Sequence, residues 1–76
     1  MKVTIQYHGM LKKYNQDLPE REEDLPEGAT VRELIARSGV PGEEIAFAAV
    51  DDSRVPAAHA LKEGDRVKLF QLVGGG

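Results

Sequence analysis

The sequence contains no cysteine, and this absence limits the chemistry that the chain can perform. The chain can form no disulfide, offers no thiolate to a metal and has no cysteine nucleophile, so thiol chemistry would have to come from a partner. Long apolar stretches are missing as well, since no run approaches the roughly 18 residues of a membrane-spanning helix. Met1 and Lys2 lead directly into an alternating pattern instead of the apolar block of a signal peptide. We therefore expect a cytoplasmic protein with no membrane partner.

Positive charge is scarce in this short chain. The 76 residues include 10 Lys and Arg against 13 Asp and Glu, which gives a net charge of −3. A protein that binds phosphate backbones needs a basic surface, so we expect no nucleic-acid partner. The length allows one small domain over residues 1–76 and leaves little room for both a core and a catalytic cleft. An enzyme is therefore not expected.

Side chains that usually hold metals or transfer protons are few and poorly spaced. His8 and His59 are the two histidines, and neither belongs to a metal-binding or histidine–carboxylate motif. The chain has no nucleophile elbow, and its glycine run does not open a helix as a phosphate-binding loop does. We expect no metal site, no bound cofactor and no catalytic residue in the chain itself.

Apolar residues alternate with polar ones near both ends of the chain. Val3, Ile5 and Tyr7 predict a half-buried strand that ends at Gly9. Residues 66–73 predict a second regular strand, with Val67 and Leu69 toward the core. The same alternation turns three side chains outward, and these are the candidates for a partner-binding surface: Lys68, Phe70 and Leu72.

The clearest helix signal lies between these strands. Thr30 and Glu33 form a capping box, and Gly39 is a left-handed C-cap, so the helix is expected from Val31 to Ser38.

The segments on either side of this helix give weaker signals. Before it, a single helical turn is expected near Leu11, and the acidic residues 17–27 predict a solvated edge strand or loop. A docking surface for a basic partner is the alternative for this acidic stretch. After the helix, residues 46–50 predict a short strand, residues 51–54 a turn, and residues 55–56 a brief return strand at an edge.

This order of elements predicts an α+β fold, a mixed sheet of four to five strands with one main helix packed on one face. The first and last strands are the most regular, so we place them side by side and parallel at the sheet centre. The expected core is Val3, Ile5, Val31, Leu34, Ile35, Val50, Val67 and Leu69.

Three glycines follow the last strand: Gly74, Gly75 and Gly76. Glycine has no Cβ, so residues 74–76 are expected to form a slender, flexible tail that can enter a channel too narrow for side chains. From Val73 to Gly76 the chain can extend at most about 13–14 Å. A terminal carboxylate is ionised at pH 7 and could attack an activated phosphate, given a partner that supplies ATP and magnesium.

The chain as a whole resembles the ubiquitin-like sulfur carriers of the MoaD/ThiS family, which comprise the small subunit of molybdopterin synthase and the sulfur carrier of thiamine biosynthesis. The matching segments are Val3-Thr4-Ile5, Thr30-Val31-Arg32-Glu33-Leu34, Ala49-Val50-Asp51, Val55, Leu61, Gly64-Asp65, Val67, Leu69-Phe70 and Gly75-Gly76. The resemblance implies a ubiquitin-like β-grasp fold. It also implies that a partner adenylyltransferase, related to ubiquitin-activating enzymes, adenylates Gly76 with ATP and Mg²⁺. A sulfur donor then leaves a thiocarboxylate on Gly76, with Gly74 and Gly75 in the partner's active site.

The sequence leaves the receiving pathway open. The long segment before Thr30 resembles the molybdopterin synthase subunit, whose large subunit would accept the sulfur. The ending Leu69-Phe70-Gln71-Leu72-Val73 is closer to the thiamine carrier, whose acceptor would be thiazole synthase. Carriers of other sulfur pathways are a third possibility. A plain interaction module and a protein modifier joined through Gly76 to lysines are the alternatives outside sulfur transfer.

Overall fold

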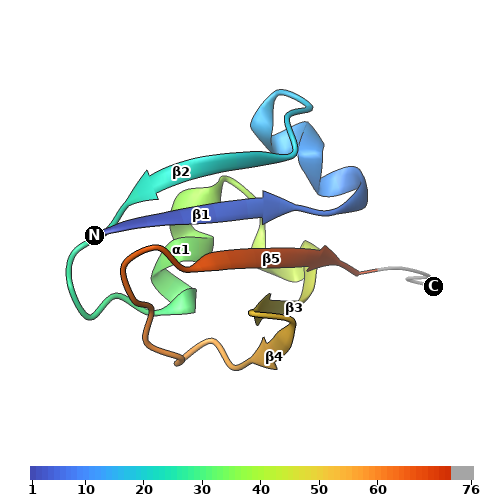
Figure 1. Ribbon diagram of the computed structural model, residues 1–76. Helices are drawn as coiled ribbons and strands as arrows, with labels where there is room; N and C mark the ends of the chain where they lie inside the picture. Colours follow the sequence, from blue (N-terminus) through green and yellow to red (C-terminus); the bar gives the residue numbers. More distant parts are fainter. Residues whose placement is uncertain (73–76) are drawn as a thin grey trace.

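The computed structural model describes residues 1–72 and shows one five-stranded sheet with a helix across one face (Figure 1). The strands are β1 (Lys2–Tyr7), β2 (Glu20–Asp24), β3 (Ile45–Val50), β4 (Ser53–Val55) and β5 (Arg66–Gln71), in the order β2-β1-β5-β3-β4. The α-helix α1 spans Val31–Ser38, and two 3-10 helices are η1 (Gly9–Asn15) and η2 (Gly42–Glu44). The predicted α+β fold, with a mixed sheet and one main helix, is confirmed.

Strands β1 and β5 lie side by side in parallel at the centre of the sheet, as the sequence predicts. Their register runs from Thr4 opposite Arg66 to Tyr7 opposite Leu69. The inward side chains of the two strands are at most 3% exposed, because α1 covers them: Val3, Ile5, Tyr7, Val67 and Leu69. Central strands lose the most apolar surface to the core, which explains why they carry the most regular alternation.

Helix α1 begins and ends where its capping residues predict. The Thr30 hydroxyl accepts a hydrogen bond from the Glu33 amide at 3.4 Å, and Gly39 adopts a φ of +84°. Within residues 1–72 the return bond from the Thr30 amide to the Glu33 carboxylate is absent, and Thr30 instead bridges to Ala60. The predicted inner face is confirmed, with three residues buried and Ile35 half-buried at its rim: Val31, Leu34 and Ser38.

The segment between β1 and α1 is more ordered than its sequence suggests. The expected single turn near Leu11 is a seven-residue 3-10 helix, η1, which carries Leu11 into the core at 2% exposure. Within the acidic stretch, residues 20–24 form the edge strand β2, which pairs with β1 and with no other described strand, so the edge-strand interpretation is confirmed for these residues. Leu25 and Leu61 also join the core, and the sequence prediction omits all three leucines because each lies in a loop or short helix without periodicity.

The hairpin after η2 differs from its prediction by two residues. Strand β4 runs from Ser53 to Val55 rather than over residues 55–56, and Pro56 follows it. The reason is the turn: Asp51 and Asp52 both have positive φ, so two residues close the hairpin and pairing begins with Ser53 opposite Val50.

Candidate functional site

The predicted tail and its docking side chains belong to the C-terminal end of β5. Gly74, Gly75 and Gly76 lie outside the described residues, and the described part of the site ends at Leu72. Because β1 and β5 are parallel, both strands end at the same edge of the sheet. η1 continues from β1 there, and η2 leads into the neighbouring β3 (Figure 1).

Phe70 faces the open side of the sheet, as its parity predicts, but it is half-buried. The His8 ring stacks on it at a centroid distance of 4.5 Å, and the Phe47 ring stacks on it at 4.6 Å. The Arg54 guanidinium lies 4.8 Å from the centre of the Phe47 ring. These four side chains, from β4, β3, β5 and the end of β1, form a continuous stacked row across the sheet.

The stacked row depends on contacts that the sequence does not reveal. An irregularity between Ile45 and Phe47 shifts the register of β3 and brings Phe47 opposite Phe70. Side chains directly opposite each other on neighbouring strands touch, so the shift creates the aromatic pair. His8, Phe47 and Arg54 are therefore members of the candidate surface that sequence reasoning missed.

Lys68 lies beside the stacked row and is held by a weak ion pair. Its ammonium is 3.4 Å from Asp52, whose side chain is 88% exposed. A similar exposed pair joins Arg66 to Glu20 at 3.5 Å, from the central strand to the acidic edge strand. Exposed ion pairs of this kind contribute about 0–1 kcal/mol, so a partner carboxylate could replace Asp52 at little cost.

Exposed apolar side chains gather where β5 ends. Leu72 is 58% exposed and Met10, on η1, is 68% exposed. Both line a shallow hollow of about 180 Å³, together with Leu11, Gln71 and three charged residues, Lys13, Glu43 and Glu44. Exposed apolar side chains beside charged ones at the root of the predicted tail suit a protein partner, because protein interfaces combine apolar anchors with polar groups.

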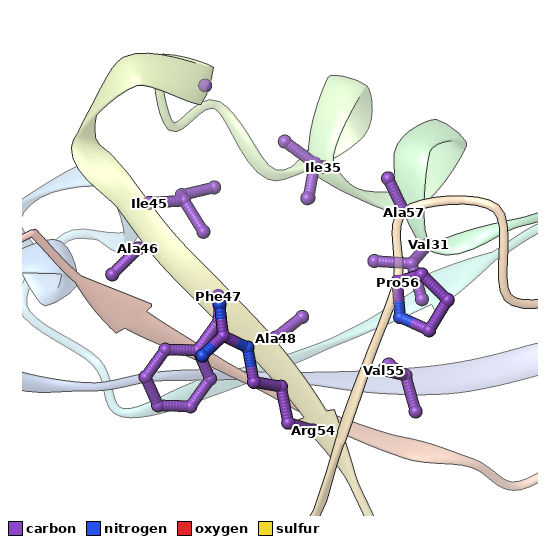
Figure 2. Close-up of a pocket in the computed structure, with 11 residues that line it drawn as sticks. Val31, Ile35, Ile45, Ala46, Phe47, Ala48, Arg54, Val55, Pro56 and Ala57 are labelled. Atoms are coloured by element: carbon purple, nitrogen blue, oxygen red, sulfur yellow. The ribbon is translucent and has the colours of Figure 1, made fainter.

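A larger groove of about 470 Å³ lies between α1 and the β3–β4 hairpin (Figure 2). Val31 and Ile35 of the helix face Val55 and Pro56 across it, and Arg54 is the one charged side chain among the described residues that line it. None of the predicted site residues within 1–72 lines this groove. Over the same residues, no group of three His, Asp or Glu side chains could hold a metal ion, and no helix is long and apolar enough to cross a membrane.

Comparison with solved structures finds similar chains. A candidate molybdopterin-converting factor subunit 1 from Pyrococcus furiosus is 31% identical, with a TM-score of 0.77, and the match covers 96% of this chain and 99% of that one. SAMP1 from Haloferax volcanii is 16% identical over the full length of both chains, with a TM-score of 0.78. A chain from the complex of molybdopterin-converting factor subunits 1 and 2 of Helicobacter pylori is 22% identical over both full lengths, with a TM-score of 0.68. The two more distant likenesses show a shared fold, the ubiquitin-like β-grasp.

Comparison with curated proteins gives no match. The model of the ThiS family matches residues 5–76, which is nearly the whole chain and includes the three glycines. The Pyrococcus likeness extends over almost the same length at an identity that indicates common descent. The protein therefore belongs to the ThiS family, a group of small ubiquitin-like sulfur carriers and subunits.

Proposed function

We propose that this protein carries sulfur on the carboxylate of Gly76 and serves as the small subunit of a molybdopterin synthase. The observation that carries the proposal is the family match, which continues through Gly76. The 31% identity to a candidate molybdopterin-converting factor subunit favours this pathway over thiamine biosynthesis. A carrier of the thiazole synthase pathway is the alternative within the family.

The proposed chemistry needs only a positioned carboxylate from this chain. A C-terminal carboxylate has a reference pKa near 3.5, so it is anionic at neutral pH and can attack the α-phosphorus of ATP. Pyrophosphate leaves, and Gly76 becomes an acyl-adenylate. A sulfide equivalent from a sulfur donor then displaces AMP, which leaves a thiocarboxylate. The partner adenylyltransferase, related to ubiquitin-activating enzymes, supplies ATP, Mg²⁺ and the catalytic groups.

The open sheet face and the root of the tail supply the contact with this enzyme. Leu72 offers exposed apolar surface, Phe70 offers a half-buried ring between His8 and Phe47, and Lys68 offers a cation paired with an exposed carboxylate. Aromatic and apolar anchors near a polar rim are the residues that usually contribute most to protein binding. We assign the same surface to contact with the synthase large subunit. The single tail can enter only one active site at a time, so the two partners bind in turn and can use the same surface.

The test is the mass of the protein after incubation with its adenylyltransferase, Mg-ATP and sulfide. Exchange of one carboxylate oxygen for sulfur adds about 16 Da, nearly the same as oxidation of Met1 or Met10, so the shift has to be mapped by fragmentation. We expect the added mass on Gly76 alone, and no shift for a chain that lacks Gly74, Gly75 and Gly76. The fragmentation also identifies the terminal residue of the mature protein.

Two results would contradict the proposal. An unmodified Gly76 in the complete reaction would support a plain interaction module, in which removal of Gly75 and Gly76 leaves partner binding unchanged. Isopeptide adducts between Gly76 and lysines of other proteins, without a thiocarboxylate, would support a protein modifier. Delivery to the molybdopterin pathway is tested by adding the loaded protein to a synthase large subunit and to a thiazole synthase, and only the former should consume the sulfur.

A further inference from the structure

We propose that Gln71 and Glu44 are positioning residues that clamp the root of the tail between η1 and η2. This inference rests on the proposed function and adds to it the means by which the fold directs Gly76. The clamp consists of two hydrogen bonds, one on each side of the chain as it leaves β5. Its bonds involve the Gln71 side chain and the backbone amides of Met10 and Leu72, three residues that also line the hollow at the root of the tail.

The first bond joins Gln71 to η1. The Gln71 side-chain oxygen Oε1 accepts a hydrogen bond from the backbone amide of Met10. Gly9 makes this contact possible, because a Cβ built on it would lie 2.9 Å from Gln71 Cδ and nearer still to Oε1. Gly9 also has a φ of +59°, a conformation that disfavours side chains. Both the space and the backbone geometry at Gly9 therefore favour the Gln71 contact.

The second bond joins the next residue to η2. The Leu72 amide donates to the Glu44 carbonyl oxygen at 2.9 Å, and the Glu44 amide donates to Pro41 at 2.9 Å, which closes the η2 turn. The Glu44 carboxylate reaches the other side of the chain, where it accepts a hydrogen bond from the Tyr14 hydroxyl of η1. Lys13 Nζ lies 4.0 Å from the second carboxylate oxygen. η1 and η2 are thus linked to each other as well as to the tail root.

The clamp fixes the starting point of the tail relative to the docking surface. Beyond Leu72, four residues remain up to Gly76, and they can span at most about 13–14 Å. If the starting point of the tail is already fixed, less conformational entropy is lost when the carboxylate enters the partner's active site. This preorganisation favours binding. Once the tail is seated, its chemistry is the same with or without the clamp. A loosened clamp should therefore raise the KM for this protein and leave kcat unchanged.

Three substitutions test the clamp. Gln71→Met keeps the length of the side chain but removes the acceptor, and Tyr14→Phe removes the hydrogen bond between η1 and the Glu44 carboxylate. Gln16→Met is the matched control, since Gln16 is exposed and its side chain makes no hydrogen bond within the described residues. A hydrogen bond in a protein corresponds to a factor of roughly three to ten in an equilibrium constant, so we expect Gln71→Met to raise KM about three- to tenfold. Tyr14→Phe should raise it less, and Gln16→Met should leave it unchanged.

An independent measurement follows the Leu72 amide by ¹⁵N relaxation in the protein alone. The order parameter of Leu72 should be about 0.8 or higher in the wild type and fall below about 0.6 in Gln71→Met, with unchanged values in the β1 and β5 amides that confirm an intact fold. A low wild-type value would show that no clamp exists, and a value that Gln71→Met leaves unchanged would overturn the role assigned to Gln71, because the Leu72 bond to Glu44 would then hold the root by itself. A lower order parameter without a change in KM would exclude the positioning role. If the wild type is not adenylated while Leu72 is rigid, the proposed function fails and the clamp stands as a feature of the fold alone.

Discussion

Replacement of Leu72 by serine is expected to weaken binding to the adenylyltransferase about 4- to 20-fold. Full burial of a leucine side chain is worth about 1.5–3 kcal/mol, and 58% of Leu72 is exposed in the free protein. If the partner covers that fraction, the lost contact amounts to about 0.9–1.7 kcal/mol, which gives the stated change in dissociation constant. Titration calorimetry without ATP measures the constant directly, because no turnover occurs.

Leu18 provides a matched control for this substitution. Leu18 is 55% exposed, so Leu18→Ser removes nearly the same apolar surface from the free protein, and it lies in the turn after η1 rather than at the end of β5. We expect its dissociation constant to stay within twofold of the wild type, and both variants to unfold at the wild-type temperature. Equal weakening by the two variants would refute a specific apolar contact at Leu72, and so would a change below twofold for Leu72→Ser.

The other predictions concern the stacked row, the core, the helix cap and the response to pH. Phe70→Ala should raise the KM of adenylation, and an unchanged adenylation rate and partner affinity would remove Phe70 from the docking surface. Leu69→Ala should lower the free energy of unfolding by about 2–5 kcal/mol in urea titration, since Leu69 is 0% exposed; a loss below about 0.5 kcal/mol would contradict the strand-face assignment. Thr30→Ala should cost about 1 kcal/mol and Thr30→Ser much less, because serine keeps the oxygen that accepts the Glu33 amide. Burial raises the pKa of Tyr7, and the Glu44 hydrogen bond raises that of Tyr14. The folded state then retains protons that the unfolded state has lost above pH about 10, so stability is fully present below that pH and falls as the pH rises through the folded-state pKa values. Tyr14→Phe should make this alkaline fall shallower, and an unchanged slope would contradict the assigned shift.

Much of the fold was predictable because its central elements are periodic. The alternation of β1 and β5 and the capping residues of α1 are local signals, and each reports which side chains face the core. Leu11, Leu25 and Leu61 were not predictable, because single apolar residues in loops give no sign of which ones the sheet and helix will cover. The hairpin shift was not predictable for another reason, since Asp51 and Asp52 are two consecutive non-glycine residues with positive φ, which is uncommon.

The candidate site also has a part that the sequence predicts and a part that it does not. The outward direction of Lys68, Phe70 and Leu72 follows from parity alone. The partners of Phe70 in the stacked row come from segments far apart in sequence, and a local register shift in β3 is needed to align Phe47 with it. The Gln71 contact with the Met10 amide likewise joins residues about sixty positions apart. Long-range contacts of this kind have no signature in a single sequence.

The central position of β5 has a consequence for the order of biosynthesis. Within residues 1–72, β5 is translated after the other strands, and among these strands it alone joins the β1–β2 pair to the β3–β4 pair. A nascent chain that ends before residue 66 therefore lacks the strand that connects the two pairs, and any pair that forms would have an unpaired edge that could associate with other chains. Closure of the sheet brings together residues about sixty positions apart, which is a slow step in folding. The complete sheet can therefore form only after synthesis has continued through Gln71, so a partner that recognises the folded sheet binds chains that have been made at least as far as the root of the tail.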